Sequence, residues 1–248
     1  MQSQEWFSNW FNSHYYHLLY NNRDEIEANT FISKIIHYLK PLPNSRMLDV
    51  ACGKGRHSKA LSEMGFDVIG IDLSEESIKE AKLSESRQLH FYKHDMRLPF
   101  YINYFDIVFN LFTSFGYFRT QREHNNAIRS ITQGIKQNGI LVIDYLNTHF
   151  EENNFTSSIE KEIDKLKFII TKWQTETHFY KQIQVADSTN GLPRHLSTER
   201  VAKFSLGDFN EMLSLQNMQI QQVFGDYNLN EYHINTSPRM IILAKKVS

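Results

Sequence analysis

The sequence predicts an α/β fold in which a doubly wound, mostly parallel sheet carries an inserted antiparallel β-meander. Three observations lead to this class. Short apolar runs alternate with helix-length segments between residues 46 and 146, a glycine loop follows the first of those runs, and strand-like runs without helices fill residues 159–204. Strands separated by helix-length crossovers pair in parallel, whereas strands joined by short turns pair antiparallel.

Composition narrows the classes of function. The chain of 248 residues has 27 basic and 28 acidic side chains and a net charge of −1. The net charge is therefore too small to attract nucleic acid or an anionic membrane. Cys52 is the single cysteine, so no disulfide can form within the chain. The N-terminal stretch MQSQEWFSNWFN lacks the basic flank and continuous apolar core of a signal peptide or membrane span, and we expect a cytoplasmic protein.

The N-terminal part is rich in aromatic side chains and has helical patches. One helical face ahead of the break at Pro41 carries Ile32, Ile35, Ile36 and Leu39. We therefore expect a helical cap over residues 1–45.

The central part alternates between strands and helices. The predicted strands are Met47–Ala51, Asp67–Ile71, Leu89–Lys93, Phe105–Asn110 and Ile140–Tyr145. The predicted helices are a segment from Arg56 to a stop at Gly65, then Glu75–Lys82, and finally Gln121–Lys136, which Asn138 and Gly139 would end. A sheet of another topology is the alternative to a parallel, doubly wound one.

The pattern changes after Leu146. Apolar and polar residues alternate in Phe168–Trp173 and Phe179–Val185, which is typical of a sheet with one face toward water. A helix at Asp208–Leu215 and strands at Gln219–Phe224 and Met240–Ala244 then return to the first pattern. We expect one domain over residues 46–150 and 206–248, with residues 151–205 as an antiparallel insertion that forms a lid or a dimer interface.

The stretch LDVACGKGRH, residues 48–57, predicts a strand, a glycine loop and a helix that present backbone N–H groups to a polar ligand. Gly53 and Gly55 lack the third glycine of the dinucleotide fingerprint, and the phosphate-loop pattern is also absent. Asp72 follows Gly53 by 19 positions, at the end of the second strand. A carboxylate there can accept hydrogen bonds from both hydroxyls of a ribose, which favours an adenosine ligand.

Five motifs in one order resemble class I S-adenosylmethionine-dependent methyltransferases. They are LDVACGKGRHS, VIGIDLS, HDMRLPF, FDIVFNLFTSFGYF and IKQNGILVIDYLN, and the similarity covers residues 46–147 with a fainter match in the last 40. The nearest subgroup is that of small-molecule N-methyltransferases, including those that act on amino sugars. The resemblance implies a seven-stranded, Rossmann-like sheet and S-adenosyl-L-methionine as cofactor.

The resemblance also implies a cofactor-binding set. Gly53 and Gly55 would let the backbone approach the methionine part, Asp49 would orient its amino group, and the backbone carbonyl of Asn110 would lie near that group. Asp72 would hold the ribose, while Asp95 and the Met96 backbone N–H would bind the adenine. Ala51, Leu73 and Leu111 complete the set. Each of these aspartates also has a purely structural alternative: Asp49 would be an ordinary carboxylate at a strand end, and Asp95 would form a turn. Cys52 would be a small residue that fills the loop.

The aromatic segment HYYHLLYNNRD belongs to the same interpretation. In related enzymes an N-terminal helical segment folds over the cofactor, which would place Tyr15 at the reaction centre and Tyr20 at the cofactor. A tyrosine ring suits a cationic neighbour. Arg23 would pair with the cofactor carboxylate. The alternatives are that Tyr15, Tyr16 and Tyr20 only pack against the core and that Arg23 is a solvated surface residue.

The acceptor is expected at the carboxyl ends of the strands, near Thr113–Tyr117, the helix that carries His124, and the insertion. His124 would act as base for an amine that arrives protonated, although an exposed histidine without a role is the alternative. Trp173, His178, Tyr180, Arg194 and His195 of the insertion would wall the pocket.

The predicted function is methyl transfer to a small-molecule acceptor, an amine in the favoured form. The Asn/Asp-Pro-Pro-aromatic signature of enzymes that methylate planar amines is absent, which disfavours nucleic acid. A non-catalytic S-adenosylmethionine-binding protein, a methyltransferase acting on RNA or protein, and a nicotinamide dehydrogenase are the competing classes. We assign no metal ligand, expect no membrane partner, and expect a monomer or a homodimer.

Overall fold

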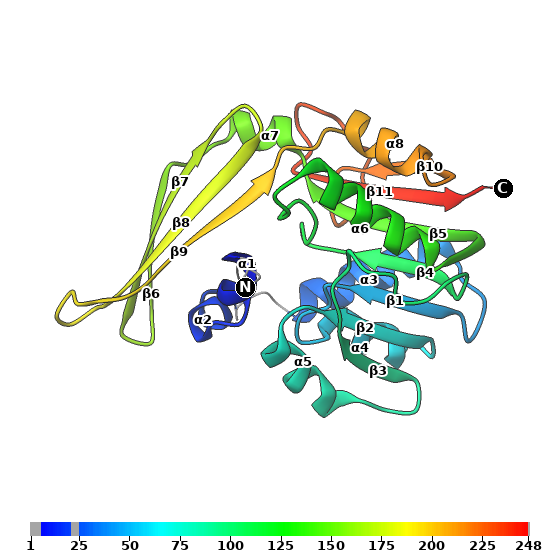
Figure 1. The fold of residues 1–248 in the computed structure, drawn as a ribbon, viewed down its shortest axis with the longest axis horizontal. Helices are drawn as coiled ribbons and strands as arrows, with labels where there is room; N and C mark the ends of the chain where they lie inside the picture. Colours follow the sequence, from blue (N-terminus) through cyan, green and yellow to red (C-terminus); the bar gives the residue numbers. More distant parts are fainter. Residues whose placement is uncertain (1–5, 21–24, 248) are drawn as a thin grey trace.

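The computed structural model describes residues 6–20 and 25–247, which form two sheets and the helices around them (Figure 1). The larger sheet has seven strands in the order β10-β11-β5-β4-β1-β2-β3. Its strands are β1 (Arg46–Val50), β2 (Asp67–Asp72), β3 (Leu89–Lys93), β4 (Phe105–Asn110), β5 (Ile135–Leu146), β10 (Met218–Phe224) and β11 (Arg239–Lys246). The pairs among β1 to β5 are parallel, and β11 joins β5 and β10 antiparallel. The predicted fold class is confirmed.

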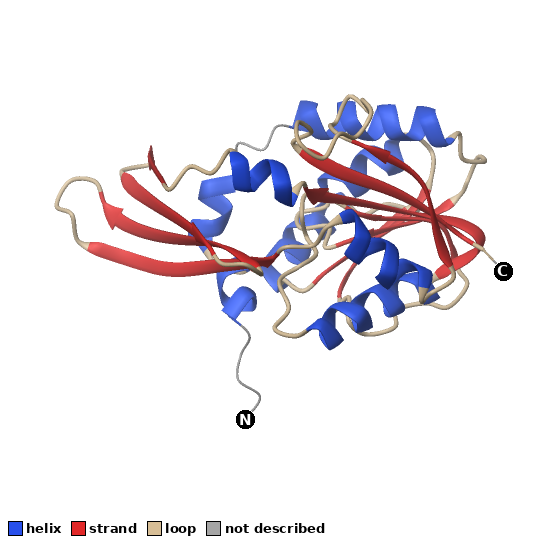
Figure 2. Ribbon diagram, turned by 90° about the horizontal axis from the view of Figure 1, so that it is seen from above, coloured by secondary structure: helices blue, strands red, loops and turns tan. Residues whose placement is uncertain are grey.

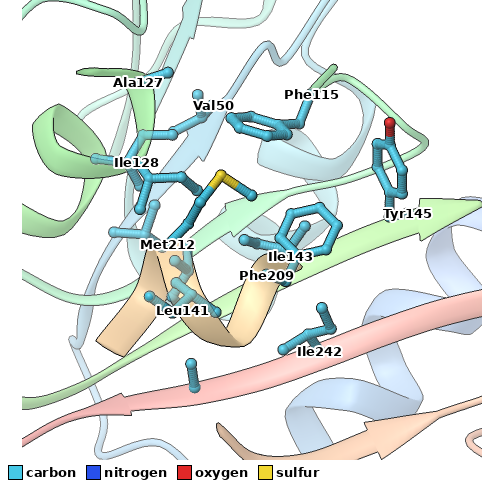
Figure 3. Packing of buried hydrophobic residues seen from close by; sticks show 14 of the residues in the cluster. Val50, Phe115, Ala127, Ile128, Leu141, Ile143, Tyr145, Phe209, Met212 and Ile242 are labelled. Carbon is cyan, nitrogen blue, oxygen red and sulfur yellow. The ribbon is translucent and has the colours of Figure 1, made fainter. Parts of the chain in front are cut away.

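Helices cover both faces of this sheet. One face packs on α3 (Glu25–Leu39), α4 (Arg56–Glu63) and α5 (Glu75–Ala81), whose last turn continues as a short 3-10 turn, Lys82–Ser84. In the apolar stripe that the sequence predicts ahead of Pro41, Ile32 and Ile35 are buried there beside Phe31, and Ile36 and Leu39 are partly buried. The opposite face packs on α6 (Gln121–Gln133) and α8 (Leu206–Ser214), with Ile128 and Met212 against Val50 and Ile143 (Figure 3).

The end of α6 differs from the prediction. The helix ends at Gln133 instead of Lys136, and β5 begins at Ile135 instead of Ile140. Ile135 is fully buried and pairs with Phe105 of β4, so burial in the sheet outweighs continuation of the helix. Asn138, with φ 64°, lies inside β5, where the register with β4 shifts. The Asn-Gly signal therefore marks a β-bulge within a strand, not a helix end.

The smaller sheet is the predicted insertion between β5 and α8. After α7 (Thr148–Asn153), its strands β6 (Ser158–Ile163), β7 (Leu166–Gln174), β8 (His178–Asp187) and β9 (Pro193–Ala202) form an antiparallel meander in chain order. The meander projects from the larger sheet in both views (Figures 1 and 2).

The N-terminal helices α1 (Trp6–Phe11) and α2 (His14–Tyr20) lie against one face of the meander. Trp10 and Leu19 pack there on Phe168, Ile170 and Ile183. This cluster is separate from the two that flank the larger sheet. Within residues 6–20 and 25–247, no helix has both the length and the apolar character that a membrane crossing requires.

Candidate functional site

A pocket of about 380 Å³ lies at the carboxyl ends of the strands, between the larger sheet, α1–α2 and the meander. The larger sheet contributes the loops after β1, β2, β3 and β4. Helices α1 and α2 contribute Phe11, Tyr16 and Tyr20. Open α/β sheets bind ligands at this edge, so the fold and the cavity indicate the same location.

The glycine loop after β1 has the conformation that its sequence predicts. Ala51, Gly53 and Gly55 have φ of 60°, 57° and 81°, in the left-handed region. A Cβ on Gly53 would meet no atom within 4 Å, so this backbone faces open space in the pocket. A Cβ on Gly55 would overlap the ring of Phe91, which also lies against Gly70 of β2. Gly53 thus leaves open space at the pocket, whereas close packing with Phe91 requires a glycine at position 55.

Asp72 lies at the pocket with both carboxylate oxygens oriented by backbone. The Gly53 N–H donates to Oδ2 at 2.8 Å and the Ser74 N–H donates to Oδ1 at 2.7 Å. Burial raises the pKa of Asp72, against these hydrogen bonds, which lower it. Each oxygen keeps a second acceptor site, so the carboxylate can take two further donors, such as the hydroxyls of a ribose. Leu73, also predicted, lines the same part of the pocket.

Asp95 and Met96, the predicted adenine residues, line the pocket after β3. Arg97 donates from Nη2 to Asp95 Oδ2 at 2.6 Å, and its backbone N–H donates to Oδ1 at 2.9 Å. Burial by itself would raise the pKa of Asp95, but the bonds and charge of Arg97 outweigh it and hold the pKa below its usual value. Asp95 is therefore both a turn former and a pocket residue.

Asp49 and Asn110 lie behind the pocket lining. Asp49 is 1 % exposed and accepts a hydrogen bond from the Ser58 hydroxyl at 2.6 Å, while burial raises its pKa to about 7. Asn110 donates from Nδ2 to the Val50 carbonyl at 3.1 Å. Both side chains brace the loop after β1. Of the other predicted cofactor residues, Ala51 and Gly53 line the pocket, whereas Gly55 and Leu111 do not.

The loop after β4 is held by a network that the sequence did not reveal. Phe112 and Thr113 both have φ 57°, an uncommon conformation for residues with a Cβ. The Phe112 N–H donates to Asp144 Oδ2 at 2.8 Å, and Asp144 is fully buried. Arg239 donates from Nε to Asp144 at 2.8 Å and from Nη2 to the Thr113 hydroxyl at 2.9 Å. In the sequence Asp144 is one polar residue in an apolar strand, and nothing there connects it to residue 239.

The N-terminal helices are fastened to the meander at Glu199. Trp10 donates from Nε1 to Glu199 Oε1 at 2.7 Å, and the Tyr20 hydroxyl donates to the same oxygen at 2.9 Å. Lys181 contacts the Tyr20 hydroxyl and lies 3.7 Å from Glu199 Oε2. Tyr20, Lys181 and Glu199 all line the pocket. This polar cluster therefore closes the side of the pocket opposite the larger sheet.

The tyrosines of α2 divide between two surroundings. Tyr16 and Tyr20 line the pocket, whereas Tyr15 stacks on His195 of β9 with ring centroids 5.2 Å apart. Of the two tyrosines predicted at the site, Tyr20 lines the pocket and Tyr15 does not, while its neighbour Tyr16 does. Adjacent residues point about 100° apart around a helix, so sequence alone does not fix the inward one. Arg23 lies outside the described residues.

His124 does not line the pocket. It is 3 % exposed and packs against Phe115, Phe118 and Phe204, with ring centroids 4.9 to 5.3 Å away. Burial lowers its pKa to about 4, against the nearby backbone of Gly116 and Thr120, which raises it. The Thr120–Glu123 capping box starts α6 at Gln121 and turns His124 onto the face that packs against the sheet. We therefore discard His124 as the base.

The meander contributes different residues from most of those predicted. Trp173 stacks on Tyr180 at 5.2 Å, Arg194 pairs with Asp187 at 2.9 Å, and His195 packs on Trp10. Only Tyr180 of the five predicted wall residues lines the pocket. The other meander residues in the lining are Lys172, Phe179, Lys181, Glu199 and Val201. The sequence does not identify these residues, because strand register decides which alternate side chains face inward.

Comparisons with known proteins agree with this geometry. Residues 42–189 match the family model of a methyltransferase domain. A relative named as a methyltransferase, YqeM of Bacillus subtilis (strain 168), is 30% identical over 211 residues, which is 81% of this chain and 84% of that protein.

Solved structures share the fold. An S-adenosylmethionine-dependent methyltransferase from Clostridium acetobutylicum superposes with a TM-score of 0.78 at 15% identity, covering 94% of this chain and 96% of that one. CalS10 from Micromonospora echinaspora, an amino pentose methyltransferase with S-adenosylmethionine bound, superposes with a TM-score of 0.69 at 18% identity, covering 95% of this chain and 98% of that one.

Proposed function

Because this chain belongs to the class I S-adenosylmethionine-dependent methyltransferases, we propose that it transfers the methyl group to an amine of a small molecule. The enzyme class and the cofactor follow from membership of the family. The acceptor and the roles of individual residues are the proposal.

The residues around the glycine loop fit the cofactor. Gly53 offers an open backbone, and Asp72 has acceptor sites left for two hydroxyl donors. We assign Ala51 and Gly53 to the methionine part, Asp72 and Leu73 to the ribose, and Asp95 and Met96 to the adenine. Asp49 and Asn110 act on the loop from behind, and any contribution from the Asn110 carbonyl comes from backbone.

The cofactor supplies an electrophilic methyl on a sulfonium. This chain's residues need only align an acceptor nucleophile with that methyl and keep water away from both. Such positioning can supply on the order of 7–11 kcal/mol of the barrier. Phe11, Tyr16 and Tyr20 cover the pocket and exclude water, while the Asp144–Arg239 network fixes the loop at Phe112 and Thr113.

The observation that favours an amine is the charge on the acceptor side of the pocket. The carboxylate of Glu151 of α7 belongs to the lining there, whereas the charge of Glu199 of β9 is taken up by Trp10, Tyr20 and Lys181. A carboxylate attracts a protonated amine and can accept the proton that the amine must lose before it attacks. CalS10, with the same fold, acts on an amino pentose, which is an amine of this size class.

We further propose that α1 and α2, from the predicted cap of residues 1–45, and the insertion of residues 151–205 act together as the acceptor-side lid, whereas α3 packs on the larger sheet. Glu199 joins them, and the inner face of the meander is occupied by α1 and α2. The dimer-interface alternative then concerns only the outer face of the meander.

Release of S-adenosylhomocysteine against a panel of acceptors tests the proposal. The panel contains small amines, matched hydroxy compounds and tRNA, and the Asp72→Ala variant gives the background. We expect product with one or more small amines and none with the hydroxy analogues or tRNA. Product with tRNA alone, or with hydroxy compounds alone, would contradict an amine acceptor.

A further inference from the structure

A row of charged side chains crosses the inner face of the meander. Lys172 of β7 lies directly opposite Lys181 of β8, which lies directly opposite Glu199 of β9. Because side chains alternate along a strand, Lys172 shares its face with Phe168 and Ile170. Those two residues pack on the N-terminal helices, so this is the face that looks into the pocket. All three charged residues line it.

Two like charges directly opposite each other destabilise a sheet unless something compensates them. Glu199 compensates the charge of Lys181, because its Oε2 lies 3.7 Å from Lys181 Nζ. Lys181 also contacts the Tyr20 hydroxyl. Glu199 also accepts from Trp10 and Tyr20, so its charge is already shared among three donors. It has little capacity left for Lys172.

Lys172 has no acidic partner within the described ranges. No carboxylate there lies within 4.0 Å of its ammonium group. The third cation of the pocket lining is Arg239, and the fully buried Asp144 neutralises it at 2.7 Å. Lys172 is therefore the basic residue of the pocket wall whose charge the described residues leave uncompensated.

We propose that Lys172, supported by Lys181, binds an anionic group of the acceptor, a carboxylate or a phosphate. The acceptor is then a small molecule with both an amine and an acid group, and Lys172 sets which end enters first. This inference rests on the proposed function and deepens it. A half-buried lysine opposite a second lysine gains most from a ligand that brings the missing negative charge.

The first test measures anion binding directly, with no acceptor required. Protein made with lysine labelled with ¹³C at the ε carbon is saturated with S-adenosylhomocysteine and titrated with inorganic phosphate, pyrophosphate or acetate. We expect a saturable shift of the Lys172 signal, identified by its absence from Lys172→Met. Lys167 is the internal control, because it lies on the opposite face of β7 and pairs with Glu160 at 2.8 Å. Saturation by the phosphates indicates a phosphorylated acceptor, and saturation by acetate indicates a carboxylate. No saturable shift with any of the three would overturn the proposal.

The second test uses the amine that the acceptor panel identifies. Lys172→Met should raise its KM about ten- to hundredfold, the loss of one charge-assisted hydrogen bond, with little change in the KM for S-adenosylmethionine. Lys172→Arg should restore most of the affinity, and Lys167→Met should behave as the parent. An unchanged acceptor KM in Lys172→Met would refute the anion site while the methyltransferase assignment stands. If no amine is turned over, the amine proposal fails, and the titration still decides the anion site.

Discussion

At the scale of single residues, the pocket separates side chains that meet a ligand from side chains that hold others in place. We assign Asp72 to the first kind, because the Gly53 and Ser74 N–H groups orient its oxygens and leave acceptor sites free. Asp144 is of the second kind, since it is fully buried and its partners lie on the loop after β4 and on β11. We therefore expect replacement of Asp72 to weaken ligand binding and replacement of Asp144 to lower the stability of the protein.

Asp72→Ala should weaken S-adenosylmethionine binding without unfolding the protein. Each charge-assisted hydrogen bond that is lost is worth roughly 1.5–3 kcal/mol, so the Kd should rise at least about tenfold. Titration calorimetry measures the effect, and circular dichroism confirms the fold. Asp67→Ala, at the other end of β2, is the matched control. Unchanged affinity in Asp72→Ala would show that the ribose assignment is wrong.

Asp144→Asn should destabilise the protein, because it leaves the guanidinium of Arg239 buried without its counter-charge. Breaking one side of a buried ion pair costs about 3–5 kcal/mol. Urea unfolding gives the loss, and the double variant with Arg239→Met should recover part of it. Turnover should also fall, with kcat affected more than the KM for S-adenosylmethionine, since the pair positions Thr113. Equal unfolding free energies for the parent and Asp144→Asn would contradict this role.

His124→Leu tests the corrected position of that histidine. Its pKa of about 4 in the folded protein lies below the ordinary value of 6.5, so the unfolded chain binds the proton first as pH falls. Its contribution to stability is therefore present above pH 6.5 and is lost between pH 6.5 and about 4. His124→Leu should flatten the pH dependence of unfolding in that window and leave the pH profile of turnover unchanged. A loss of turnover that is largest below the pKa of the acceptor amine would restore His124 as a base.

At the scale of elements, the sequence predicted regular segments well and their facing residues poorly. Strands β3 and β4 have the predicted bounds, Leu89–Lys93 and Phe105–Asn110. The identity of the inward tyrosine and the inward meander residues could not be predicted. Both depend on contacts between segments more than 100 residues apart, such as Trp10 and Glu199, which are 189 positions apart.

Trp10→Phe should loosen the lid. The change keeps an aromatic ring in the buried cluster but removes the Nε1–H that donates to Glu199 at 2.7 Å. A lost hydrogen bond to a charged group costs about 1.5–3 kcal/mol, so we expect lower turnover and a higher acceptor KM. Trp173→Phe is the matched control, because Trp173 lies 38 % exposed on the outer face. Equal kinetics for both variants would argue against a lid held at Glu199.

At the scale of the whole molecule, the two sheets have hydrophobic cores of different size, so we expect them to differ in local stability. The larger sheet is covered by clusters on both faces, whereas the meander rests on one small cluster with α1 and α2. Elements with few buried apolar contacts open at lower free energy than the global unfolding. The meander and the N-terminal helices should therefore open together, ahead of the seven-stranded sheet.

Hydrogen exchange followed by mass spectrometry tests this order. Amides of β7 and β8 should exchange at least about tenfold faster than those of β1 and β4. Trp10→Ala should accelerate the meander further and leave β1 and β4 unchanged. Exchange at one common rate in both sheets would indicate a single cooperative unit.

Phe91 has a consequence for how this sequence can diverge. Its ring fills the space that side chains at Gly55 and Gly70 would need, so a substitution at either glycine is harmful while Phe91 remains. Replacing Phe91 with a smaller residue first would leave a void in the core, at a cost of about 2–5 kcal/mol. Gly70 and Phe91 are thus epistatic, and each route away from this pair passes through a less stable intermediate, whereas Gly55, with φ of 81°, is strained by any side chain. Random libraries that retain function should keep Gly55 and either keep Gly70 and Phe91 or change them jointly, which deep sequencing of the survivors would reveal as covariation.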